Sequence, residues 1–210
     1  MQIKTYAKPI DLKILKDKTD KIFQNRKIVI PSIIAISGIF FGSFNAKGEG
    51  LLYKKITDIF INVLFSNEIK ISQEFFNSLI IPMIIFFLEF VLGMSIIGTL
   101  IINVLPFCYG YLIGQITYFL YSTYSLKGLA YSVLILFPYA VITMLAIIMN
   151  CMTSIKLSQS LLGSVLKSGK NCFFEFKEYS ICLLKYFIIL LIGVVIKTVL
   201  SYFLSGFFNF

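Results

Sequence analysis

Two charged residues lie near the middle of long apolar stretches of this 210-residue sequence. Glu89 interrupts FFLEFVLGMSIIG, residues 86–98, and Lys197 interrupts a similar run near the C-terminus. A charge surrounded by lipid is costly, so such groups pair, become neutral or line a cavity. The sequence predicts that Glu89 and Lys197 face each other, or that Glu89 is protonated and hydrogen-bonded. The alternative is that Lys197 extends to the interface and that Glu89 lies close to one.

Other residue types that carry catalysis are scarce. The chain has no histidine, which excludes the HExxH zinc motif and any Ser–His or Cys–His pair. All of the aspartates lie outside the apolar runs, and the cysteines lack zinc-ligand spacing. No phosphate-binding glycine loop occurs. We therefore expect a protein that is not an enzyme and that uses no cofactor or metal.

The composition is that of a membrane protein. Hydrophobic residues make up 58% of the chain and charged residues only 14%, which departs from soluble domains in both respects. The net charge of +9 fits lysines held against anionic lipid. No basic module for nucleic acid is recognisable, so the expected partner of these charges is membrane lipid.

Runs of about 20 apolar residues predict an all-α integral membrane protein with about five transmembrane helices. The expected membrane domain covers 28–206, with an outer loop at 45–77 and an inner loop at 155–183. Gly98 is the preferred turn between the second and third spans, with residues 103–106 as the alternative. Residues 123–128 form the next turn. The five spans are expected at about 28–44, 78–97, 100–122, 129–154 and 184–206.

The N-terminal residues 1–27 are basic, and 9–27 carry an apolar face at helical spacing. They are expected to form a cytoplasmic amphipathic helix on the inner leaflet, or else a solvated charged tail. With the N-terminus inside, the inner segments hold twelve Lys and Arg and the outer segments hold five. This excess predicts a cytoplasmic N-terminus and an extracytoplasmic C-terminus in the cell membrane.

Small residues four apart mark candidate packing faces. GIFFG holds Gly38 and Gly42, and GYLIG holds Gly110 and Gly114. Such pairs let helix backbones approach closely, within one chain or between copies in a homo-oligomer. Pro138 is expected to kink the fourth span. The other candidate packing positions are Gly93 and Gly98.

The outer loop carries apolar residues at helical spacing, which predicts a short amphipathic helix outside the membrane. Because this helix would be exposed, its apolar face is the candidate surface for docking a partner. The residues of that face are Leu52, Ile56, Phe60 and Val63.

Several local motifs resemble the stage II sporulation protein M family. They are SGIFFGSF at 37–44, GMSIIG at 93–98, CYGYLIG at 108–114 and KGLAYSVLILFP at 127–138. The family is similar in length and has five predicted spans with one larger outer loop. The resemblance covers about 28–160, with similar hydropathy beyond it. Many members carry a polar pair such as Gln–Asn after the proline, where this chain has Tyr139 and Ala140.

The resemblance implies a non-enzymatic membrane scaffold in the mother cell, active when it engulfs the forespore during endospore formation. The implied partners are the stage II sporulation proteins D and P, which degrade peptidoglycan. A permease subunit of a transporter, paired with a separate ATPase, is the alternative function. Its support is the number of spans and the basic inner segments, but the spans offer few polar residues for a solute path.

Overall fold

The computed structural model describes residues 12–46, 71–166 and 172–204, and the regular structure in these ranges is entirely helical. The predicted all-α fold class is therefore confirmed. The long helices are α1 (Leu12–Asn45), α3 (Ile71–Gly93), α5 (Val104–Tyr131), α6 (Phe137–Leu166) and α7 (Cys172–Leu204). Two short elements join them, the single turn α4 (Gly98–Ile101) and the π-helix η1 (Ser132–Leu136).

Four helical stretches of the described chain are long and apolar enough to cross a bilayer: Ile28–Asn45, Ile71–Gly93, Gly98–Gly163 and Lys177–Leu204. The third has 66 residues, which exceeds a single crossing more than twofold. The chain reverses direction within it at Ser125, where φ is +51° and ψ is −123°. Ser125 lies within the turn expected at 123–128.

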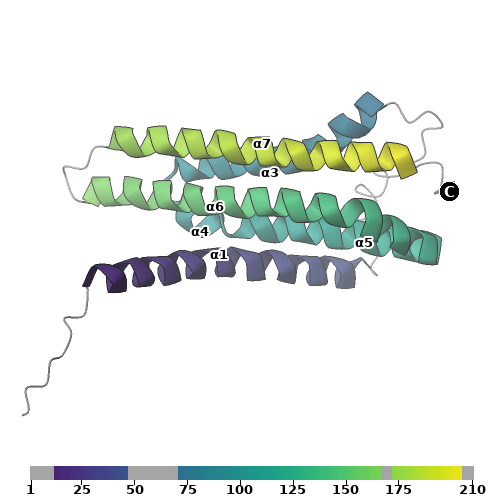
Figure 1. Ribbon diagram of the computed structural model, residues 1–210, viewed down its shortest axis with the longest axis horizontal. Helices are drawn as coiled ribbons and strands as arrows, with labels where there is room; N and C mark the ends of the chain where they lie inside the picture. Colours follow the sequence, from purple (N-terminus) through teal and green to yellow (C-terminus); the bar gives the residue numbers. More distant parts are fainter. Residues whose placement is uncertain (1–11, 47–70, 167–171, 205–210) are drawn as a thin grey trace, which may run out of the picture.

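Contacts across this reversal show that α6 runs antiparallel to α5 and to the connection just before it. The hydroxyl groups of Tyr109 and Thr143 share a hydrogen bond, and the thiol of Cys151 donates to the carbonyl of Ile102. Earlier residues of the first helix thus contact later residues of the second, as in a helical hairpin. The third apolar stretch thus supplies two helices that run between the same two ends of the molecule (Figure 1).

The remaining long helices lie beside this hairpin (Figure 1). Ring contacts of Phe86 with Phe187 and of Phe90 with Tyr179 pair α3 with α7 in antiparallel fashion. Helix α1 runs parallel to α5 and, in the described ranges, contacts only α5 and α6. Five long helices therefore form one bundle, with Leu12 and Leu204 at opposite ends.

Two helix boundaries differ from the sequence-based expectation. Helix α3 begins at Ile71, seven residues before the expected start at 78, so Glu74 lies in a helix and not in the outer loop. Helix α1 runs without a break through Lys27, so the expected N-terminal helix and the first span form one helix of 34 residues. Pro31 lies inside α1, where the helix continues past it.

The connection between α3 and α5 covers residues 94–103 and includes α4. Gly98, the preferred turn residue, begins this single turn. A Cβ atom at this position would lie 1.8 Å from the carbonyl oxygen of Leu92. The sharp reversal therefore requires glycine here.

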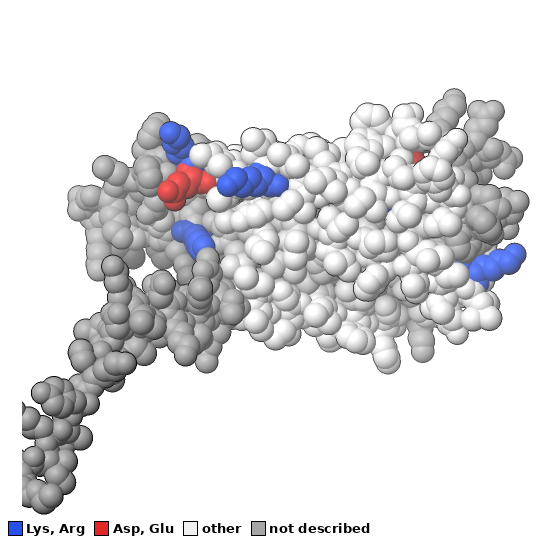
Figure 2. Space-filling model, viewed as in Figure 1, with Lys and Arg blue, Asp and Glu red and all other residues white. Residues whose placement is uncertain are grey.

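Charged side chains gather towards the two ends of the bundle and leave a largely uncharged belt between them (Figure 2). Lys156, Lys177 and Glu178 lie near the junction of α6 and α7, and Lys127 lies near the turn at Ser125. Positions 128–155 contain no charged residue. This distribution matches a bundle that crosses the apolar part of a bilayer.

Candidate functional site

The glycine pairs of α1 and α5 face each other in the structure. A Cβ atom on Gly42 would lie 2.1 Å from the carbonyl oxygen of Tyr111, and one on Gly114 would lie 2.2 Å from that of Ile39. Gly38 and Gly110 are equally tight against Phe107 and Ala35. All four glycines are thus used for packing within the chain, because only glycine lets these backbones come so close.

A side-chain hydrogen bond reinforces this helix pair. The hydroxyl of Ser43 lies 3.0 Å from the carbonyl oxygen of Ile39 in its own helix and 3.2 Å from that of Gly114 in α5. The close approach of the glycines brings these groups within reach.

The other candidate packing residues lie at helix junctions. Gly93 is the last residue of α3, and a Cβ there would lie 3.0 Å from Cβ of Ser154 and 3.1 Å from the hydroxyl of Tyr179. Pro138 is the second residue of α6, which begins directly after the π-helix η1. Because proline has no backbone N–H, it removes one helical hydrogen bond, and a local π-turn is a common accommodation.

The predicted Glu89–Lys197 pair is wrong, because each residue has another partner. The side-chain amide of Asn150 donates a hydrogen bond of 2.8 Å to Oε2 of Glu89. The ammonium of Lys197 lies 3.4 Å from Oε1 of Glu74 and 2.7 Å from the hydroxyl of Ser78. Since Ser78 and Glu89 are eleven residues apart on α3, the two charged sites are separated by about 16 Å along the helix.

The Lys197 site is a buried network of three helices. Lys197 and Glu74 are both 4% exposed. The Tyr139 hydroxyl donates 2.8 Å to the backbone carbonyl of Ser78, and the Lys197 ammonium lies 5.3 Å from the centre of the Tyr139 ring. A cavity of about 30 Å³ borders Ser78, Tyr109, Tyr139 and Lys197, which is room for about one water molecule. Tyr139, which follows Pro138 where the resemblance leads one to expect a polar pair, is therefore part of this site.

Asn150, the partner of Glu89, belongs to a polar stripe on α6. Asn150, Ser154 and Ser158 follow one another at four-residue spacing, and all are fully buried. Ser154 shares a 3.0 Å hydrogen bond with the Tyr179 hydroxyl, and Ser158 donates 2.7 Å to the carbonyl of Ser95. Interhelical hydrogen bonds of this kind fix helices against one another in a membrane.

Sequence reasoning missed Glu74 and Asn150 as partners, although the pattern of α3 contains a signal for the first. The buried residues of α3 recur at intervals of three and four and form one stripe: Glu74, Ser78, Pro82, Ile85, Phe86, Glu89 and Gly93. Extending this stripe backwards from Glu89 leads to Glu74. The candidate docking residues Leu52, Ile56, Phe60 and Val63 lie outside the described residues.

The buried polar groups of the described residues connect helices to one another. The buried acidic and basic groups contact side chains of neighbouring helices. No group of three or more Cys, Asp or Glu residues that could hold a metal occurs in the described ranges. The polar groups can therefore orient the helices of the bundle.

The family model described as stage II sporulation protein M matches residues 32–208, which is most of the chain. No curated protein and no solved structure matched the chain.

Proposed function

Because the chain belongs to the stage II sporulation protein M family, we propose that it is a non-enzymatic membrane scaffold that holds peptidoglycan hydrolases. Family membership makes it a sporulation-related membrane protein with several apolar helices. The proposed role is to recruit these hydrolases while the mother cell engulfs the forespore. The stage II sporulation proteins D and P are the proposed partners.

The observation that carries the scaffold proposal is the internal pairing of the buried charges. Lys197 contacts Glu74 and Ser78, and Glu89 accepts from Asn150, so these groups hold helices together. A permease would need polar groups that line a path for its solute. Because these buried groups are already bound to neighbouring helices, they support a rigid scaffold better than a path for a solute.

The proposed docking segment is the outer loop 45–77. Because α3 begins at Ile71, the segment between α1 and α3 is shorter than this expected loop, and the helix ends that flank it lie at the end of the bundle that holds the turn at Ser125 (Figure 1). We place this end outside the cell membrane and the N-terminus inside. Lys156 and Lys177 at the opposite end, together with the basic residues 1–27, support this orientation.

The test is purification of the tagged full-length chain in mild detergent from sporulating cells of its own host, followed by identification of the proteins that accompany it. Membrane-anchored peptidoglycan hydrolases are the expected result. The double variant Ile56→Asp/Phe60→Asp should lose them. Leu162→Asp, at the other end of the bundle, should retain them and serves as the control.

One result would contradict the scaffold proposal, and another would contradict only the docking segment. A soluble ATPase recovered in place of the hydrolases would make this chain a transporter subunit. Hydrolases that remain bound to the Ile56→Asp/Phe60→Asp variant would place the docking surface elsewhere than the outer loop.

A further inference from the structure

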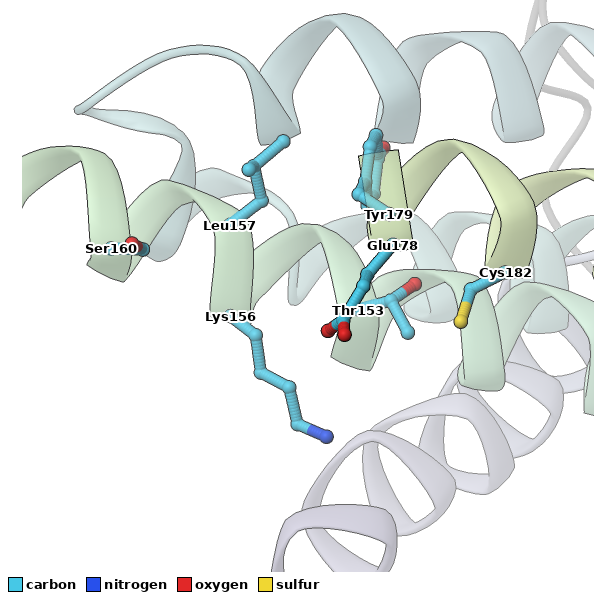
Figure 3. A pocket seen from close by; sticks show the side chains of 7 residues that line it. All are labelled: Thr153, Lys156, Leu157, Ser160, Glu178, Tyr179 and Cys182. Carbon is cyan, nitrogen blue, oxygen red and sulfur yellow. The ribbon is translucent and has the colours of Figure 1, made fainter. Parts of the chain in front are cut away.

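A mixed polar pocket lies between α6 and α7, at the end of the bundle opposite the turn at Ser125 (Figure 3). Its volume is about 350 Å³, within the range of small-ligand sites. It combines one cation, one anion, three hydroxyl groups and a thiol. The lining residues are Thr153, Lys156, Leu157, Ser160, Glu178, Tyr179 and Cys182.

The two charged side chains of this pocket do not form an ion pair with each other. Figure 3 shows the Lys156 ammonium and the Glu178 carboxylate extending from neighbouring helices to the same side of the pocket. The ion pair formed in the described ranges is that of Lys197 with Glu74, so Lys156 and Glu178 do not pair with each other. A ligand with an anionic and a cationic group could therefore contact both.

The back of the pocket is fixed by buried contacts. Tyr179 is 4% exposed, shares its hydroxyl hydrogen bond with Ser154, and stacks on Phe90 with ring centres 6.0 Å apart. The Thr153 hydroxyl donates 2.9 Å to the carbonyl of Asn150. Because α6 and α3 hold Tyr179 and its own helix holds Thr153, the back of the pocket is preformed.

The position of the pocket matches the headgroup layer of a bilayer. Lys156 follows the turn at Ser125 by 31 residues, which corresponds to about 46 Å of helix. The hydrocarbon core is about 30 Å thick, and the bilayer with headgroups is about 40–45 Å thick. When the turn lies in one headgroup layer, the pocket lies in the other, beside the uncharged positions 128–155.

We propose that this pocket binds the phosphoethanolamine headgroup of a membrane phospholipid. The Lys156 ammonium contacts the phosphate, and the Glu178 carboxylate accepts hydrogen bonds from the primary ammonium of the ligand. A primary ammonium has three N–H donors, whereas a quaternary ammonium such as choline has none. A purely anionic headgroup leaves Glu178 opposite a like charge. The inference does not depend on the scaffold function.

The test uses the purified full-length chain in detergent, titrated with equal amounts of phosphatidylethanolamine, phosphatidylglycerol and phosphatidylcholine. Native mass spectrometry counts the bound lipids, and their ratio in one spectrum does not depend on protein yield. Phosphatidylethanolamine should dominate. Glu178→Gln should lower its ratio to phosphatidylglycerol by up to about fivefold, the upper end of the range for a solvent-exposed ion pair.

Matched variants separate this site from general attraction between lysine and lipid. Lys156→Ala should reduce binding of all three lipids, because each of them carries the phosphate that the ammonium contacts. Lys185→Ala, an exposed lysine on α7 outside the pocket lining, should leave the ratios unchanged. Equal binding of the three lipids by the unmodified chain, or an equal loss in Lys185→Ala, would overturn the proposal.

A last arm distinguishes the lipid from a soluble source of the same group. Free O-phosphoethanolamine at the concentration of the lipid should not displace it, because the acyl chains add contacts with the apolar helix faces. Displacement at equal concentration would overturn the lipid assignment and make the soluble compound the ligand.

Discussion

Lys197 and Glu74 meet inside the helix bundle, with Nζ 3.4 Å from Oε1, although 122 residues separate them in the sequence. Ser78, one turn beyond Glu74, accepts a hydrogen bond of 2.7 Å from the same ammonium. This contact ties the first turn of α3 to the last third of α7. It explains why a lysine is tolerated at a fully buried position.

Breaking this pair should unfold the bundle more readily. Lys197→Met leaves the Glu74 carboxylate buried without its cation, and Glu74→Gln leaves the ammonium without its anion. Each change should lower the free energy of unfolding by about 3–5 kcal/mol, and the double variant should lose less than the sum. Thermal unfolding in detergent measures this. Additive losses would show that the two groups do not stabilise each other.

The hydrogen bond between Asn150 and Glu89 predicts unequal effects of two changes. Glu89→Gln keeps a carbonyl oxygen that accepts from Asn150, so stability should change by less than about 1 kcal/mol. Asn150→Leu leaves the buried carboxyl without that donor and should cost about 1–3 kcal/mol. Chemical or thermal unfolding of both variants provides the comparison. A larger loss in Glu89→Gln than in Asn150→Leu would contradict the assigned bond.

The glycine contact between α1 and α5 should be sensitive to a single methyl group. Gly42→Ala places Cβ against the Tyr111 carbonyl, so α1 must move away from α5. We expect a loss of about 1–3 kcal/mol from this overpacking. Gly163→Ala is the matched control, because nothing lies within 4 Å of a Cβ there and alanine favours the helix. Equal melting temperatures of the two variants would contradict the packing.

The proposed orientation predicts which end of the bundle is reached from outside the cell. In a chain whose native cysteines are replaced by serine, Lys127→Cys should react with a membrane-impermeant maleimide in intact cells. Lys156→Cys should react only after the cells are opened. The reverse pattern would place the N-terminus outside and would remove the outer loop as the docking segment.

Much of the fold follows from apolar length and from glycine. The turn at Ser125 and the reversal around Gly98 occur where the sequence leaves too many apolar residues for one crossing. The glycines of α1 and α5 also act as their spacing predicts. These features depend on local pattern, which a sequence displays directly.

The partners of the buried charges depend on how each helix is rotated and shifted, which local pattern does not determine. Counting residues along the spans placed Glu89 and Lys197 at similar depth. The true start of α3 at Ile71 instead brings Glu74 level with Lys197. Asn150 could not be recognised as a partner from the sequence. Its companions at four-residue spacing, Ser154 and Ser158, are small residues that are common in apolar helices.

The separation of partners along the chain has a consequence for biosynthesis. Ser43 and its acceptor at Gly114 are 71 residues apart, which at bacterial elongation speeds of 5–20 residues per second is about 4–14 seconds. The glycine face of α1 therefore lacks its packing partner until α5 is made, and it contacts lipid or the insertion machinery in the meantime. Glu74 waits longer still for Lys197. Of the described helices, α7 is thus synthesised last and supplies the cation for the buried carboxylate of Glu74, so this bundle cannot be completed before α7 has been made.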